Sequence, residues 1–159
     1  EVGVQRMCFF TKNDSQWNYS GVDSLNNLKV GVATDTTSEE LNAYIAQHKK
    51  QFKFMSYNDK YIAKSLKKLD AGRIDTFMFT YNSTIYELNE KGLSDQFRSA
   101  GCASLSKVYM AFTPDQAQTS DVKKMMAYFD VKMAELKKSG QIEGIMKTYG
   151  LEDWKNYMK

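Results

Sequence analysis

The sequence predicts an α/β fold: a lobe in which helices cover both faces of a parallel β-sheet, giving three layers, followed by C-terminal helices. Two observations predict it. Short apolar segments alternate with amphipathic ones between residues 28 and 90. Each apolar segment also runs into a cluster of threonine, serine, asparagine or aspartate, which are residue types that begin helices. Strands that alternate with helices pair in parallel through right-handed crossovers, so the helices come to lie on the faces of the sheet.

Three strand–helix units account for this region. The apolar segments predict strands at residues 28–33, 52–55 and 74–79, and the amphipathic segments predict helices at residues 39–48, 59–72 and 80–92. Asp59 is expected to cap the second helix, in which Ile62, Leu66 and Leu69 share one apolar face. Gly72 is expected to end that helix, since glycine readily adopts a positive φ.

Two further apolar segments flank the three units. Residues 7–11 and 108–113 are predicted to be strands, and Pro114 ends the second. A long helix is expected at residues 120–139, followed by a short one at 141–149. The long helix carries an apolar stripe at helical spacing, which we interpret as ordinary core or lobe packing and not as a cofactor site; its members are Val122, Met126, Phe129, Met133 and Leu136.

Composition excludes several classes of function. The net charge is only +3, from 22 basic and 19 acidic residues, and the lysines cluster on predicted helix faces, so we expect no nucleic-acid partner. No apolar run approaches the roughly 20 residues that span a bilayer. Two cysteines and one histidine do not make a zinc site. No leader segment opens the sequence, which leaves two alternatives: a cytosolic protein, or one whose signal peptide has been removed.

Polar side chains follow all three strands where each is expected to end. Because ligands bind at the carboxyl ends of parallel strands, these clusters predict a binding surface for a small polar solute. The candidate ligand-binding residues are Thr34, Asp35, Thr36, Thr37, Tyr57, Asn58, Thr80, Tyr81 and Asn82. The alternative interpretation is structural, because the same residue types cap helices and form turns.

Catalytic residues are not evident in the sequence. His48 is expected on a helix surface, away from the loops, and no cysteine has a histidine nearby in the sequence. Acidic side chains in the loops reduce to Asp35 and Asp59. The segment GVATDTT lacks the glycine and lysine pattern of a phosphate-binding loop. We therefore expect a binding protein without a metal or cofactor, and not an enzyme.

Four stretches of the sequence carry a family resemblance. They are WNYSGVDSLNNLKVGVATDTT (17–37), LDAGRIDTFMF (69–79), residues 107–114, and LKKSGQIEGIMKTYGLEDW (136–154). In this order they resemble the entry into the second lobe, the "GRvDa" helix-to-strand corner, the returning strand and the closing "l-x-G-x-x-x-x-I-x-x-kyg" signature of one family. That family is the type 2 periplasmic solute-binding proteins of ABC importers, in particular the polar amino-acid subfamily.

The resemblance implies two lobes joined by two crossing strands, which close on a solute by hinge motion. Residues 1–11 would be one crossing strand, residues 12–107 the second lobe, and residues 108–159 the returning strand with helices that pack on the first lobe. The half-lobe that the family places before the first crossing strand is absent from the sequence, so exposed apolar surface could drive self-association or domain swapping. The resemblance further implies a periplasmic location, a mature form without a signal peptide, and a membrane permease as partner.

Two positions depart from the family pattern. Family members that bind amino acids place an aspartate for the ligand's ammonium where this sequence has Thr80, and a glycine where it has Asp35. Thr36 and Thr37, at a predicted helix N-terminus, retain the carboxylate-binding half of the pattern. The resemblance thus implies an amino acid or related carboxylate as ligand.

The sequence leaves three questions open: whether the protein is a sensor domain, whether it is an enzyme, and whether its two cysteines are bonded. The same fold serves as the ligand-sensing domain of membrane signalling receptors, and less often as an enzyme scaffold. Cys8 and Cys102 fall on or near the two crossing strands, where a disulfide is sterically allowed, but we expect the two positions to be offset.

Overall fold

The computed structural model describes residues 1–34, 36, 39–115 and 119–157. The strands are β1 (Gly3–Lys12), β2 (Val30–Ala33), β3 (Phe52–Met55), β4 (Thr76–Thr80) and β5 (Phe97–Val108). The helices are α1 (Glu39–Gln47), α2 (Tyr61–Asp70), α3 (Tyr81–Glu90), α4 (Thr119–Ser139) and α5 (Gln141–Thr148), with short 3₁₀ turns between some of them. Within the described residues, none of the helices combines the length and apolar character that a membrane span requires.

The five strands form one sheet in the order β3-β2-β4-β1-β5. β2 pairs in parallel with both β3 and β4, which confirms the predicted strand–helix units. β1 runs antiparallel to β4, with Met7 opposite Thr80 and Phe10 opposite Phe77. The beginning of β1 therefore lies at the edge where β4 ends.

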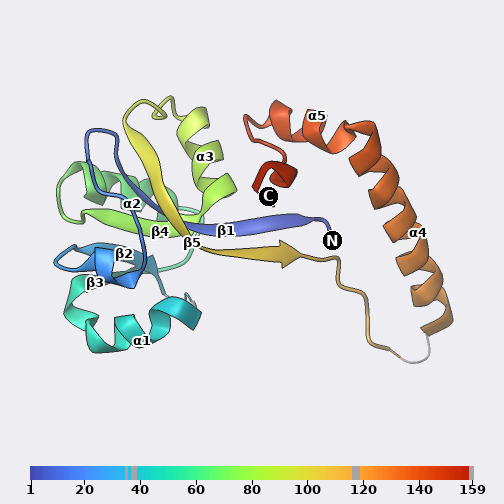
Figure 1. Ribbon diagram of the computed structural model, residues 1–159, viewed down its shortest axis with the longest axis horizontal. Coiled ribbons are helices and arrows are strands. Elements are labelled where there is room, and N and C mark those ends of the chain that lie inside the picture. The colour runs from blue at the N-terminus through green and yellow to red at the C-terminus, as the bar shows by residue number, and fades with distance from the viewer. Residues whose placement is uncertain (35, 37–38, 116–118, 158–159) are drawn as a thin grey trace. The chain divides into compact units, whose positions relative to one another are not determined.

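The alternation of side chains along β2 explains the three layers. Val30 and Val32 belong to an apolar cluster that includes Leu41 and Tyr44 of α1. Ala33 belongs to the cluster on the other face, which α2 and α3 cover with residues such as Leu66 and Leu88. Figure 1 shows α1 on one side of the sheet and α3 on the other. The predicted α/β fold with helices on both faces is confirmed.

Gly31 of β2 lies close to side chains of the second cluster. A Cβ atom built at this position would lie 3.0 Å from the side chains of Ile74 and Met55 and 3.1 Å from Cβ of Phe77. A methyl group there would force these neighbours to shift, so the packing at this position favours glycine.

Two local predictions are wrong. The last strand was expected at residues 108–113, but β5 spans Phe97–Val108, and the residues after it have no regular structure up to the end of the described stretch at Asp115. The edge position of β5 explains the error, because a strand exposed along one side needs few apolar residues. Asp59 does not cap α2: the N-cap position is Lys60, and no side chain caps the helix there.

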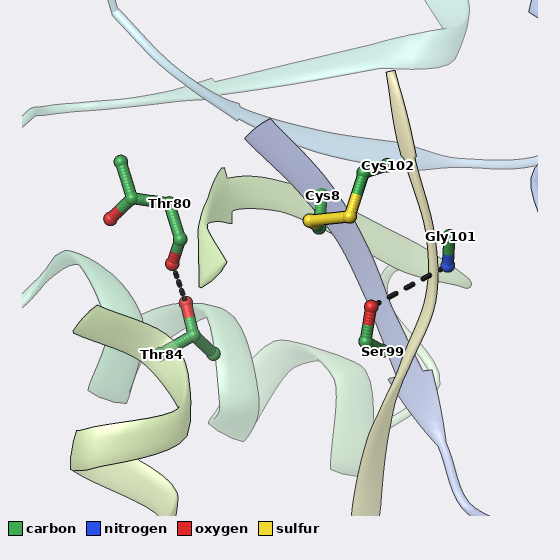
Figure 2. Close-up of a disulfide and its surroundings, with 6 residues drawn as sticks. All are labelled: Cys8, Thr80, Thr84, Ser99, Gly101 and Cys102. Carbon is green, nitrogen blue, oxygen red and sulfur yellow. Dashed lines mark hydrogen bonds between the residues drawn. A yellow bond between two sulfur atoms is a disulfide. The ribbon is translucent and has the colours of Figure 1, made fainter. Parts of the chain in front are cut away.

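Cys8 and Cys102 form a disulfide between β1 and β5 (Figure 2). The expectation that the two positions are offset is wrong. The N–H of Asn13 donates to the carbonyl of Gln96, and the N–H of Val2 to that of Val108, both at 2.8 Å. These bonds place β5 antiparallel beside β1 at both ends of the pair, and the disulfide joins two residues that face each other between them.

The chain divides into two compact units, one of residues 6–105 and one of residues 1–5 together with the segment from Ser106 onward. Both boundaries fall inside β1 and β5. The second unit has a small core of Val4, Ile142 and Trp154, with Met133, Leu136, Met146 and Tyr157 packed against it.

The apolar stripe of α4 is only partly accounted for by that core. Met133 and Leu136 pack on it, whereas no residue of α4 is buried and Met126 is 45% exposed. The second half of the stripe therefore packs on that core, and packing of the first half against another lobe stays a prediction.

Candidate functional site

The carboxyl ends of β2, β3 and β4 meet at one edge of the sheet, because these strands are parallel neighbours. The described candidate residues of all three loops accordingly follow Ala33, Met55 and Phe79 at the same edge. Asp35 and Thr37 lie outside the described residues. We refer to this part of unit 6–105 as the carboxyl edge.

The first loop contains Thr34 and Thr36. Both the N–H and the hydroxyl of Thr34 donate to the carbonyl of Met55, at 2.7 and 3.0 Å, so this side chain ties β2 to β3. The N–H of Thr36 donates to the carbonyl of Ala33 at 3.2 Å, and the residue is half-buried. Thr34 thus has a structural task, and Thr36 is the better placed of the two for a ligand.

The second loop presents Tyr57 and Asn58. Tyr57 is 71% exposed, and its ring centroid lies 5.9 Å from that of Phe79. The Oδ1 atom of Asn58 accepts a hydrogen bond from the N–H of Lys60 at 3.0 Å, and Asn58 is exposed. An exposed phenol ring beside an amide can form one wall of a binding surface.

The third loop is short because β4 leads directly into α3. The carbonyl of Thr80 accepts a hydrogen bond from the Thr84 hydroxyl at 2.9 Å (Figure 2). The Thr80 hydroxyl is buried and has no hydrogen-bond partner in the described part of the chain. Tyr81 and Asn82 are half-buried at the first turn of α3, which has neither a side-chain cap nor an acidic residue.

Arg6 is a residue of this edge that the sequence analysis missed. It precedes Met7, the partner of Thr80, and its guanidinium carbon lies 3.7 Å from the ring centroid of Tyr81. The available signal was the pair Gln5–Arg6 directly before an apolar strand. It becomes informative only once the antiparallel pairing of β1 with β4 is known.

No cluster of metal ligands is found at the carboxyl edge among the residues that the structure describes. Within the described residues, no group of three or more His, Cys, Asp or Glu side chains could hold a metal ion. His48 is exposed, and its ring stacks on Tyr44 with centroids 4.1 Å apart. The described donors and acceptors at the edge are hydroxyls, amides, a guanidinium and the carboxylate of Asp59, which suit recognition of a polar solute.

Two cavities lined by described residues lie at the opposite edge of the sheet. One of 460 Å³ is lined by Lys12, Asp14, Asp70 and Asp95, among others, and the Nζ atom of Lys12 lies 3.5 Å from a carboxylate oxygen of Asp70. A second, of 270 Å³, lies between the ends of α2 and α3, at Leu66 and Leu93. Neither includes a candidate ligand-binding residue.

Comparison with known proteins gives likeness in structure only. No protein-family model matches the sequence, and no curated protein matches it. A histidine kinase sensor domain with similarity to periplasmic binding proteins has 21% identity and a TM-score of 0.61, covering 95% of this chain and 62% of that one. The L-cystine solute receptor of Neisseria gonorrhoeae, unliganded and open, has 15% identity and a TM-score of 0.61, covering 96% and 59%.

Arginine-binding proteins show the same likeness. A mutant of ArgBP from T. maritima has 14% identity and a TM-score of 0.61, covering 93% of this chain and 58% of that one. An ancestral arginine-binding protein bound to arginine has 16% identity and a TM-score of 0.57, covering 91% and 60%. The chain thus spans less than two thirds of the length of each of these structures. At such identities the likeness shows the fold alone: the chain has the α/β fold of periplasmic binding proteins.

Proposed function

We propose that the chain is one lobe, with its C-terminal helices, of a two-lobed solute-binding protein that takes up a small polar solute, an amino acid or related carboxylate. The solute would lie against the carboxyl edge, at Thr36, Tyr57, Asn58, Thr80, Tyr81 and Asn82, with Thr34, Asp35 and Thr37 beside them. The second wall of the cleft would come from the first lobe, and closure would follow a hinge motion at the crossing strands.

The observation that carries the proposal is the gathering of three polar loops at one edge of a sheet. Ligands of open α/β sheets bind outside the carboxyl ends of the strands, and here that edge presents hydroxyl, amide and phenol groups from three elements. Solved structures with the same fold bear names that state cystine or arginine binding. The chemistry at the edge supports binding in preference to catalysis.

Delivery to the permease of an ABC importer is the role we propose for the bound protein, in the periplasm and in a mature form without a signal peptide. The resemblance of the four sequence stretches to importer receptors supports this role. Solute released from the opened cleft would pass to the permease, so binding must be reversible on the timescale of hinge opening.

Isothermal titration calorimetry on the full-length protein, against a panel of amino acids and small organic acids, tests the proposal. We expect saturable heat with at least one member of the panel. Thr36→Val should weaken binding of a carboxylate ligand by about 1.5–3 kcal/mol, because a hydrogen bond to a charged group is lost. Lys53→Gln, an exposed change in β3, serves as control and should leave affinity unchanged. No heat with any member would contradict the proposal.

A ligand-sensing domain of a membrane receptor is the second candidate function. The likeness to a histidine kinase sensor domain favours it, with 21% identity over 95% of the chain. The coding sequence beyond Lys159 distinguishes the two roles: a membrane span followed by a kinase domain would establish the sensor, whereas a stop codon would favour the importer receptor.

A further inference from the structure

The basic side chains of the chain are concentrated in one short segment. Residues 48–68 contain seven lysines and a single acidic residue, Asp59, which gives this segment a formal charge of +6. The whole chain carries +3, so the remaining residues together carry −3. The seven are Lys49, Lys50, Lys53, Lys60, Lys64, Lys67 and Lys68. Such an asymmetry of charge is typical of a surface that meets an anionic partner.

These seven lysines also differ from the others in their ion pairs. None of them forms a salt bridge within the described residues, whereas eight lysines elsewhere in the chain do. Lys60, Lys64 and Lys68 follow one another at intervals of four residues along α2, where like charges repel. An anionic surface beside the segment would relieve this repulsion.

The sheet brings part of this charge to the edge formed by β3, which is the outermost strand on that side (Figure 1). Lys53 of β3 is exposed and pairs with Gly31 of β2, so its side chain lies on the same face of the sheet as Gly31. That face is the one covered by α2 and α3. The Nζ atom of Lys53 donates to the carbonyl of Lys50 at 3.3 Å, so these two lysines are neighbours.

The lysines of α2 are directed toward the same edge. Leu66 lines the cavity between α2 and α3, so its flank of α2 faces α3. At about 100° per residue, Lys64 and Lys68 lie on the opposite flank. Ser65 lies next to Lys64, and its Oγ atom is 4.0 Å from Sδ of Met55 in β3. This flank of α2 therefore borders β3, and its lysines extend the positive surface that Lys53 begins.

Phe54 adds an apolar side chain to the edge. It follows Lys53 in β3, points to the other face of the strand and is 54% exposed. Protection of an edge strand against pairing accounts for Lys53. It accounts neither for the lysines of α2 nor for an exposed phenylalanine. Lysines beside an exposed aromatic side chain are typical of a surface that lies among the headgroups of a membrane.

We propose that Lys50, Lys53, Lys64 and Lys68, together called the basic edge, bind the anionic surface of a phospholipid bilayer, with Phe54 among the headgroups. A diffuse negative surface suits lysines, whose compact charges stay hydrated. A protein partner suits them less, because protein interfaces are depleted in lysine and enriched in arginine, and residues 48–68 contain no arginine. The contact is peripheral. It goes beyond the proposed function and does not depend on the solute.

Co-sedimentation of the full-length protein with vesicles tests the proposal. One set of vesicles consists of phosphatidylcholine alone, and the other of phosphatidylcholine and phosphatidylglycerol in equal parts. We expect binding to the anionic set only, and we expect added salt to weaken it, because salt screens exposed charges.

Two charge-matched variants locate the contact. Lys53→Gln together with Lys64→Gln should weaken binding to the anionic vesicles by about 30-fold, which is the effect of a lysine at an anionic surface taken twice. Lys123→Gln together with Lys138→Gln removes the same charge from two exposed lysines of α4 and should leave binding unchanged. Phe54→Ala should weaken binding without altering its dependence on salt, because the side chain is uncharged.

Other outcomes would overturn the proposal. They are a lack of binding to the anionic vesicles, equal binding to both sets, and equal weakening by the two double variants. Tighter binding to a single-stranded oligonucleotide or an acidic peptide than to the anionic vesicles would overturn the assignment to lipid. The comparison of the two vesicle sets uses the unaltered protein, so a variant that fails to fold would not obscure the result. Solute calorimetry tests the proposed function separately.

Discussion

Tyr61, the first residue of α2, is a buried polar side chain whose function is structural. It is 1% exposed, its ring lies against Phe79 with centroids 4.7 Å apart, and its hydroxyl donates to the carbonyl of Met78 at 3.0 Å. Burial raises the pKa of the Tyr61 phenol well above its ordinary value of 10.0, since the charged form would lose its hydration. The residue therefore fastens α2 to β4 in its neutral form.

Replacing Tyr61 by Phe should lower the free energy of unfolding by about 1 kcal/mol at neutral pH, because the carbonyl of Met78 loses its donor. Above pH 10 the unaltered protein should lose stability further. The unfolded chain releases the phenolic proton there while the folded chain retains it, and this part of the loss should be absent in Tyr61→Phe. Urea unfolding of both proteins at neutral and alkaline pH measures the difference. Parallel pH profiles would contradict the account.

At the level of a residue, Arg6 could not be predicted from the sequence as part of the carboxyl edge. The loop residues after β2, β3 and β4 could be predicted, since a parallel sheet places all of them at one edge. Arg6 comes from the beginning of an antiparallel strand, and only the pairing of Met7 with Thr80 brings it there. Pairing partners that are far apart in sequence leave no local pattern to read.

At the level of elements, α4 is a helix that buries none of its residues. It spans Thr119–Ser139 without a buried residue, and its exposed apolar side chains include Met126, Tyr128 and Val131, at 45%, 67% and 56%. Met126 belongs to the apolar stripe, whereas Tyr128 and Val131 lie about half a turn away from it, so α4 exposes large apolar side chains on two sides. Exposed apolar surface of this extent marks a contact with another chain or segment. In the proposed two-lobed protein the first lobe would cover it.

The 159-residue chain on its own should self-associate through α4. Light scattering coupled to size exclusion should give a mass above that of one chain, falling toward one chain on dilution. Met126→Lys together with Val131→Lys should favour the single chain, whereas Ile145→Lys, an equally exposed position on α5, should not. A chain that stays monomeric at high concentration would exclude the self-association that we propose.

Elements with a strong periodic pattern were predicted from sequence, and the exceptions have physical causes. β2 is buried throughout and β4 over its first three residues, so both read as apolar runs. β3 lies at the other edge of the sheet and buries only Phe52 and Met55, yet three of its four residues are apolar. β5 carries small and polar residues such as Ser99, Gly101 and Ser104, because it lies at the edge of the sheet, and it was missed. Aspartate is a common N-cap residue, but Asp59 does not cap α2. The N–H of Lys60 donates to Oδ1 of Asn58, and α2 begins at Tyr61.

At the level of the whole molecule, the Cys8–Cys102 disulfide links residues 94 positions apart. Closing a loop of that length restricts the unfolded chain, and removal of such a bond costs about 2–5 kcal/mol. Urea unfolding with and without a reductant should show a loss of this size. The variant with Cys8→Ala and Cys102→Ser should be less stable from the outset and indifferent to the reductant. Identical midpoints for the unaltered protein in both conditions would contradict a stabilising bond.

The Cys8–Cys102 disulfide also changes the covalent connectivity of the chain. In covalent terms residues 8–102 form a closed ring, and residues 1–7 and 103–159 are two tails that leave it from one point. A protease that cuts once inside the ring opens it without releasing a fragment. A pull applied to the two ends passes through the sulfur atoms, so the covalent chain between residues 9 and 101 carries no load.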